Sequence, residues 1–173
     1  MKPVYSVRPF LLQEWRVYRD LRLRALADSP DAFSGTLVEG KDRPDAEWSG
    51  RLAAGSDPRW NFPVVAEVSG EAIGLAWGRI EPSESDVAHL YQMWVDPKYR
   101  NLGVGQMLLR AVITWAGDAN ARYLDLCVTC GDSPAARLYA RAGFMPVGDP
   151  EPLRPGSSLL AQPMRLELRS AVT

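Results

Sequence analysis

Arg100, Gly103 and Gly105 lie together in Arg100-Asn-Leu-Gly103-Val-Gly105, immediately before an amphipathic segment. The first N–H groups of a helix have no partner inside the helix, and the helix dipole adds partial positive charge at that end. Glycines there remove side chains that would keep an anion away, and Arg100 supplies a positive charge. The spacing predicts that the phosphates of a ligand bind this loop, although glycines at such a corner also serve a turn alone.

Two common nucleotide-binding motifs use the same device, and the side chains disfavour both of them. The Walker motif requires Gly-Lys-Ser/Thr at the helix start, whereas this chain has Gly105-Gln106-Met107. The Rossmann fingerprint requires a third glycine at the position of Leu108. A nucleotide-binding domain therefore remains only a disfavoured alternative.

The elements around this loop follow from hydrophobic periodicity. Strong strand character over 87–95 precedes the loop, and the segment that follows it has the clearest helical spacing in the chain, at Val104, Met107, Leu108, Ala111, Val112 and Trp115. The other predicted elements are a strand at 4–8, helices at 11–25 and 46–52, a hairpin at 64–80, a strand from Tyr123, a helix from Ser133 to Gly143, and strands at 144–147 and 164–168. This order predicts one α/β domain over residues 1–173.

Composition narrows the class of protein. The 173 residues, 46% of them apolar, are enough for a single core. The 20 basic and 21 acidic residues nearly cancel, which argues against a nucleic-acid or membrane partner. No apolar run approaches the roughly 20 residues that cross a bilayer, and the first residues do not resemble a signal peptide, so we expect a cytoplasmic protein.

Cys127 and Cys130 have the spacing of a redox or zinc motif, but they fall on a predicted strand. Three residues of strand separate them by roughly 10 Å, which is too far for a disulfide. With His89 as the single histidine, a zinc site made of Cys and His lacks ligands, and no metal is predicted. We expect buried strand thiols with no redox role.

Two motifs resemble those of the Gcn5-related N-acetyltransferase (GNAT) family. The stretch from Val95 to Gly105 resembles motif A, whose core is Arg/Gln-x-x-Gly-x-Gly/Ala. Ala136-Arg-Leu-Tyr139-Ala-Arg-Ala-Gly143-Phe144 resembles motif B in the expected order and spacing. The resemblance implies an α/β fold with a mixed, mostly antiparallel, splayed sheet and helices on both faces, and a cofactor-binding core at about 87–148. It also implies acetyl-CoA as cosubstrate.

The same resemblance implies which residues contact that cosubstrate. Main-chain amides from Leu102 to Gln106 would hold the pyrophosphate, and the backbone around Met93 to Val95 would pair with the pantetheine arm like an added strand. Ser133 occupies a position at which relatives carry asparagine, and it keeps a helix cap. The predicted cofactor-binding residues are Met93, Trp94, Val95, Arg100, Asn101, Leu102, Gly103, Val104, Gly105, Gln106, Ser133 and Tyr139.

Acetyl transfer from a thioester requires alignment of an amine, removal of its proton and stabilisation of the leaving thiolate. The resemblance implies that Tyr139 is the general acid, while its helical spacing alone is also compatible with simple packing. His89 occupies the position at which some relatives place a glutamate base, and an unperturbed histidine pKa of about 6.5 suits proton acceptance. One alternative is that His89 is structural, and another is that a water chain near Tyr91 and Gln92 takes the proton. Strand alternation puts Gln92 on the face opposite to His89 and Tyr91 unless a bulge intervenes.

The expected acceptor is a primary amine of a small molecule or peptide. In relatives it approaches between segments that correspond to 28–45, 87–92 and 149–163. Asp31, Glu39 and Asp42 could attract a cationic amine, or could form a solvated acidic loop. The rival to an enzyme is a non-catalytic acyl-CoA-binding or regulatory module of the same fold, and homodimer formation is left open.

Overall fold

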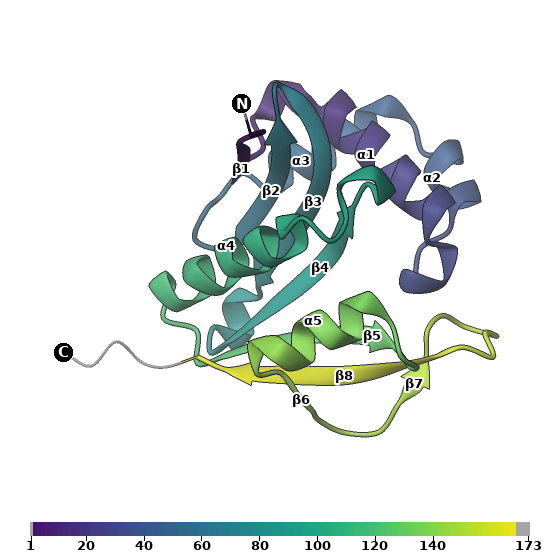
Figure 1. Ribbon diagram of the computed structural model, residues 1–173, viewed down its shortest axis with the longest axis vertical. Coiled ribbons are helices and arrows are strands. Elements are labelled where there is room, and N and C mark those ends of the chain that lie inside the picture. The colour runs from purple at the N-terminus through teal and green to yellow at the C-terminus, as the bar shows by residue number, and fades with distance from the viewer. Residues whose placement is uncertain (1, 169–173) are drawn as a thin grey trace.

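The computed structural model describes residues 2–168, which form a mixed sheet flanked by helices (Figure 1). The strands are β1 (Tyr5–Pro9), β2 (Asn61–Val68), β3 (Glu71–Ile80), β4 (Val87–Val95), β5 (Tyr123–Thr129), β6 (Met145–Pro146), β7 (Glu151–Pro152) and β8 (Leu160–Glu167). The helices are α1 (Trp15–Asp28), α2 (Leu37–Asp42), α3 (Asp45–Ala54), α4 (Val104–Asp118) and α5 (Pro134–Ala142). None of the described helices is both long and apolar enough to cross a membrane.

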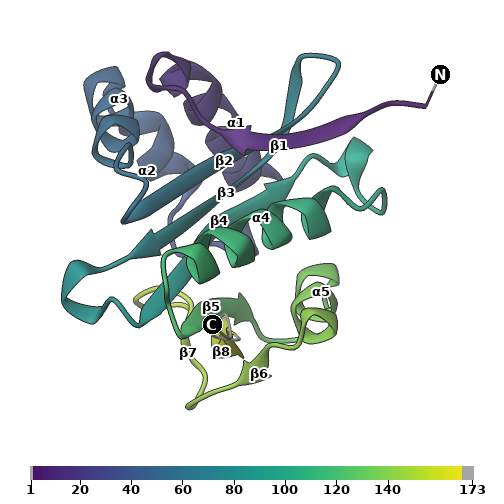
Figure 2. The ribbon, with the colours of Figure 1, turned by 90° about the vertical axis from the view of Figure 1, so that its left-hand side faces the viewer.

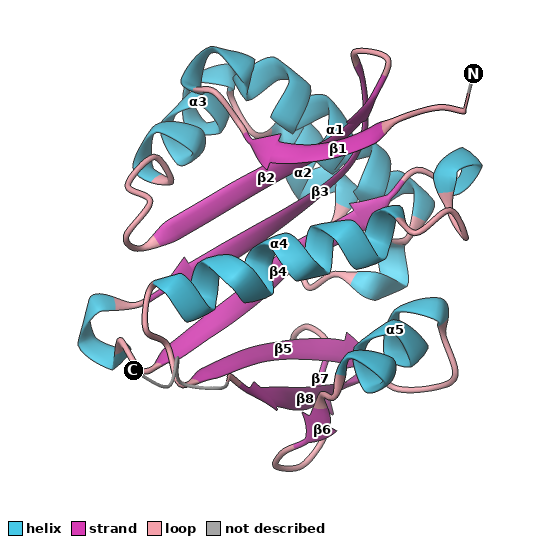
Figure 3. Cartoon of the chain, turned by 60° about the vertical axis from the view of Figure 1, so that its left-hand side comes forward, coloured by secondary structure: helices cyan, strands magenta, loops and turns pink. Residues whose placement is uncertain are grey.

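The sheet has the strand order β1-β2-β3-β4-β5-β8-β6, with β7 also paired to β8. Among the described strands, only β4 and β5 pair in parallel. They pair at three positions, from Val87 opposite Tyr123 to His89 opposite Asp125, and then diverge (Figure 3). The later part of β4 therefore pairs with β3 but not with β5. The mixed, splayed sheet predicted from the sequence is confirmed.

Helices cover both faces of the sheet because β2, β3 and β4 each have apolar residues on both sides. The α4 face packs one cluster that includes Leu108, Val112 and Leu124, and α1–α3 pack a second cluster that includes Leu21, Trp48 and Leu75. Figure 2 shows α4 on one side of β1–β4 and α1–α3 on the other. The predicted β2–β3 hairpin is present, and its turn has Ser69 and Gly70 at positive φ, as a tight turn between twisted strands requires.

α2 was not predicted from the sequence, and the last strand begins earlier than predicted. The signal for α2 is a capping box, in which the Glu39 amide donates to the Thr36 hydroxyl and the Glu39 carboxylate accepts from the Thr36 amide. β8 begins at Leu160, so Pro163 lies inside a strand. Its carbonyl accepts from Val147, on the side away from β5. Since the N–H and C=O of a strand residue point the same way, the missing N–H removes no β5 hydrogen bond.

The expectation of buried cysteines is wrong. Both thiols are free and exposed. Leu124 and Leu126 of β5 point toward the α4 cluster, so alternation turns Cys127 to the other face, and Cys130 lies beyond the end of the strand. Within residues 2–168, no group of three or more His, Cys, Asp or Glu side chains is arranged to hold a metal ion.

Candidate functional site

The loop before α4 presents a row of free main-chain donors. Gly103 caps the helix with φ 83°, and Asn101 also has positive φ, 61°. Within residues 2–168, no hydrogen bond is donated by the amides from Asn101 to Gln106. Consecutive free amides at a helix N-terminus form a concave site for an anion. These free donors lie where the sequence predicts an anion site.

The two glycines of the loop have different roles. A Cβ on Gly103 would meet no atom within 4 Å, so its side faces open space, and its positive φ disfavours other residues. A Cβ on Gly105 would instead lie 3.5 Å from Leu138 and 3.6 Å from Met93. Gly105 thus marks where α4, α5 and the free edge of β4 converge, and a methyl group fits there at ordinary contact distance.

A β-bulge changes the direction of the β4 side chains beside this convergence. The β3–β4 register shifts between the Leu75 and Trp77 pairs, and Gln92 has φ 57°. Beyond the bulge, Met93 and Val95 pack on the α4 cluster, while Trp94 packs on the α1 cluster. The bulge also turns the Gln92 side chain to the α1 face, where Gln92 accepts a hydrogen bond from Tyr18 at 3.0 Å.

Arg100 is turned away from the loop amides. Its Nε donates to the Val95 carbonyl at 2.9 Å, and its guanidinium forms an ion pair with Asp28 at the end of α1. Trp94 Nε1 also donates to Asp28, at 3.0 Å. Burial alone would raise the pKa of Asp28, but hydrogen bonds from Ser29, Trp94 and Arg100 outweigh it and lower that pKa to about 2. A phosphate contact by Arg100 would require it to leave this pair.

Tyr139 lies within the α4-side cluster. Its side chain is buried, with its ring 5.8 Å from that of Phe144. Burial raises the pKa of the Tyr139 phenol well above its usual range, because the phenolate would lose its solvation. At neutral pH the hydroxyl carries its proton. The cap predicted for α5 is present, with the Ala136 amide donating to the Ser133 hydroxyl at 3.1 Å.

His89 stands where β4 and β5 begin to separate. It pairs with Asp125 of β5 and Arg79 of β3, and its ring stacks on Tyr91 at 6.0 Å. Since Ala88 and Leu90 belong to the α4-side cluster, alternation places His89 on the opposite, α1 side of the sheet. His89 and Tyr139 therefore approach the diverging strands from opposite faces.

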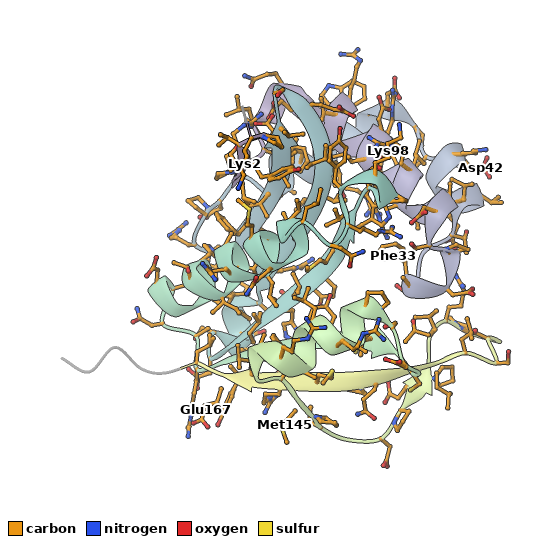
Figure 4. All side chains as sticks on the ribbon, viewed as in Figure 1. Lys2, Phe33, Asp42, Lys98, Met145 and Glu167 are labelled. Atoms are coloured by element: carbon orange, nitrogen blue, oxygen red, sulfur yellow. The ribbon has the colours of Figure 1, made fainter. Side chains whose placement is uncertain are left out.

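The connection after α1 contacts the β5–β8 half of the sheet, in the region where the sequence predicts the acceptor. Thr129 at the end of β5 donates to the Asp31 carbonyl at 2.6 Å, and Arg154 of the β7–β8 connection donates to the Pro30 and Phe33 carbonyls. Figure 4 shows Phe33 at the end of the α1 layer that faces the β5–β8 half. Glu39 is occupied by its capping box, while Asp31 and Asp42 are exposed.

Two hollows of the surface lie elsewhere. One, of about 330 Å³, is lined by α1 and the β2–β3 turn, including Glu14, Arg24 and Gly70. The other lies against α4 beside Phe62 and Trp115. Neither includes a residue predicted for the site, so we place the site by its donors and strand edge, which suit an extended ligand better than a deep cavity does.

A known family matches the part of the chain that contains the loop before α4, the diverging strands and α5. The sequence profile described as "Acetyltransferase (GNAT) family" matches residues 23–144, which is most of the chain.

The chain belongs to this GNAT family.

Two curated relatives give this GNAT chain a context. It is 30% identical over 128 residues to a mycothiol acetyltransferase from Thermobispora bispora, a match that covers 72% of this chain and 40% of that protein. It is 36% identical over 93 residues to an N-alpha-acetyltransferase from Sulfurisphaera tokodaii, which covers 48% of this chain and 56% of that protein. The chain therefore spans well under two thirds of these relatives' lengths.

Solved structures agree with the GNAT fold. A GNAT acetyltransferase from Streptococcus pneumoniae superposes with a TM-score of 0.78 at 17% identity, covering 96% of this chain and 100% of that one. The yncA protein of Salmonella typhimurium, solved with acetyl-CoA, gives 0.79 at 15% identity, covering 98% and 97%. At these identities the likeness concerns the fold alone, and it confirms the predicted fold class.

Sequence reasoning missed Tyr18 and Asp28 as parts of this region. Tyr18 falls on the predicted first helix, where its spacing indicated only a buried face, and its contact with Gln92 spans 74 residues of sequence. Asp28 ends the same helix, and its ion pair with Arg100 spans 72 residues. Neither contact leaves a local pattern.

Proposed function

We propose that this GNAT chain transfers the acetyl group of acetyl-CoA to a primary amine of a small molecule or peptide by direct attack. The observation that carries the proposal is the row of free amides at the start of α4, beside the unpaired edge of β4. Bound acetyl-CoA would supply an activated thioester. The acceptor nitrogen then needs only alignment, loss of a proton and a proton donor for the leaving thiolate.

The residues present fit that cosubstrate. The amides from Leu102 to Gln106 would hold the pyrophosphate, with open space in front of Gly103. Met93, Trp94 and Val95 would offer main-chain groups to the pantetheine arm, since β5 has left that edge of the strand. Val104 is buried and anchors the helix start, while Asn101 holds the turn at positive φ. Ser133 would contribute from the start of α5, and Arg100 would add charge once released from Asp28.

Two side chains would move protons. An alkylammonium has a pKa near 10.4, so at neutral pH a base must take its proton. His89 would accept it from the α1 side, where the acceptor connection lies. Tyr139, a neutral phenol at pH 7, would donate to the thiolate from the other face. Tyr139, a proton donor that a binding module would not need, favours this enzyme over the non-catalytic acyl-CoA-binding module.

A thiol-release screen tests the proposal. Purified protein and acetyl-CoA are mixed with polyamines, aminoglycosides, amino acids and peptides with free N-termini, and free CoA is measured. The names of the relatives favour two kinds of acceptor, a small molecule and an α-amino group. Release that depends on an amine supports the proposal. Tight acetyl-CoA binding without release for any amine favours the binding module instead.

A further inference from the structure

Arg22 of α1 is a charged side chain without a counter-ion. Within residues 2–168, its Nη1 is the buried side-chain nitrogen or oxygen atom that has no hydrogen-bond partner. A buried donor of a charged group that lacks an acceptor costs free energy, and native proteins keep few of them. The missing acceptor is accounted for when the partner of the guanidinium is a ligand rather than another residue.

The surroundings of Arg22 are apolar and positive. Its guanidinium lies over the Phe33 ring at 4.4 Å, and a Cβ on Gly35 would lie 3.8 Å from its Nη2. Burial is the main cause that lowers the pKa of Arg22, to about 10, and the nearby Arg43 and Arg51 lower it further. The group is still a cation at neutral pH. Arg43 and Arg51 share the single carboxylate of Glu47, so the local charge remains positive, and no described carboxylate pairs with Arg22.

Arg22 stands next to the acceptor side of the proposed site. Tyr18, one helical turn of about 5.4 Å before it, donates to the Gln92 amide oxygen on the β4 bulge. That contact leaves the amide nitrogen of Gln92 as a second donor. Gln92 holds a φ of 57°, a strained conformation for a non-glycine residue that often marks functional positions.

We propose that Arg22 binds an oxyanion, either a carboxylate or a phosphate, carried by the acceptor amine, an inference that rests on the proposed function. The connection from Phe33 to Gly35, which has neither helix nor strand, lies against the guanidinium and must shift to admit the anion. Two parallel hydrogen bonds from a guanidinium suit both oxyanions. The positive surroundings would also lower the pKa of the acceptor ammonium, which favours the neutral, nucleophilic amine.

Matched acceptor pairs test this inference. Glycylglycine is compared with glycylglycinamide for the carboxylate, and O-phosphoethanolamine with ethanolamine for the phosphate. The measured quantity is the ratio of kcat/KM between the anionic and the neutral member of each pair. The variants are Arg22→Met and Arg22→Lys, with Arg16→Met as matched control, because Arg16 is an exposed arginine of the same helix.

In wild-type protein, at least one anionic member should be preferred about tenfold or more, the scale of a charged hydrogen bond. Arg22→Met should bring that ratio close to one, Arg22→Lys should keep part of it, and Arg16→Met should keep all of it. The responsive pair tells carboxylate from phosphate. Ratios near one for both pairs in wild-type protein, or an unchanged preference in Arg22→Met, overturn the inference.

Two readouts separate this inference from the proposed function. Calorimetry of glycylglycine and O-phosphoethanolamine binding requires no turnover, so Arg22-dependent binding without acetylation would retain the anion site and reject the enzyme. Acetylation without Arg22-dependent discrimination would retain the enzyme and reject the anion site. Arg22→Met should also melt no lower than wild type, because it removes an unpaired buried charge. A lower melting temperature with unchanged discrimination would make Arg22 purely structural.

Discussion

The two sides of the proposed site are built differently. On the cofactor side, consecutive residues from Asn101 to Gln106 offer main-chain amides, and the geometry depends on φ at Gly103. On the acceptor side, isolated side chains from distant segments meet, as Tyr18 meets Gln92 and Arg154 meets Phe33. Substitutions on the cofactor side that keep the backbone conformation should leave acetyl-CoA binding nearly unchanged. Single substitutions on the acceptor side should instead change how acceptors bind. One ion pair, Asp28–Arg100, joins the two sides.

The largest expected effect is at Tyr139, where removal of one oxygen separates chemistry from packing. Tyr139→Phe keeps the ring against Phe144 and should lower turnover by roughly 10²-fold or more, the usual scale for a positioned proton donor. Acetyl-CoA affinity should barely change, since the proton is needed only as the C–S bond breaks. Steady-state acetylation measures turnover and the KM for acetyl-CoA, and a thermal melt shows that the variant is folded. Wild-type turnover across pH in the folded variant would assign protonation of the thiolate to solvent.

His89 tests the acceptor side by pH. His89→Ala should lower turnover near neutral pH by about 10²-fold and leave acetyl-CoA affinity nearly unchanged. As pH increases, more of the amine is already neutral, so the deficit of the variant should shrink. A variant with the wild-type rate and pH profile would make His89 structural.

Gly103 tests the cofactor side by backbone conformation. Gly103→Val should lose acetyl-CoA affinity by about tenfold or more, because a β-branched residue at φ 83° costs about 1–3 kcal/mol and shifts the amides. Gly103→Asn is the matched control, since asparagine tolerates this region better. Gly105→Ala should bind almost normally, because its Cβ has room. Undiminished affinity for folded Gly103→Val in calorimetry would reject the pyrophosphate assignment.

Asp28 should give the smallest effect, and it links the two sides. Its pKa of about 2 in the folded protein lies below the usual value near 3.9, so its contribution to stability is present above pH 4 and is lost as pH falls toward 2. Asp28→Asn should lower the melting temperature by a few degrees at pH 7, with the difference vanishing toward pH 2. It should also strengthen acetyl-CoA binding severalfold at most, because Arg100 is released. Weaker binding in this variant would indicate that the ion pair holds the loop in its binding form.

Much of the fold was predictable because it depends on local patterns. The apolar spacing of α4, the serine cap of α5 and the β2–β3 turn are each contained in a few consecutive residues, and all were placed correctly. The wrong predictions concern residues whose surroundings are set by segments that are distant in the sequence. Cys127 is exposed because of which β5 face the helices cover, and Pro163 fits inside β8 because its missing N–H points away from β5.

The sequence by itself determined the loop before α4, since free amides at a helix start and a glycine at positive φ are properties of contiguous backbone. The order and spacing of the two motifs also predicted the family. Only the tertiary structure decided how the site is surrounded: the bulge at Gln92, the Asp28–Arg100 pair and the unpartnered guanidinium of Arg22. These depend on side chains far apart in the chain, whose contacts and burial are fixed only when both faces of the sheet are packed.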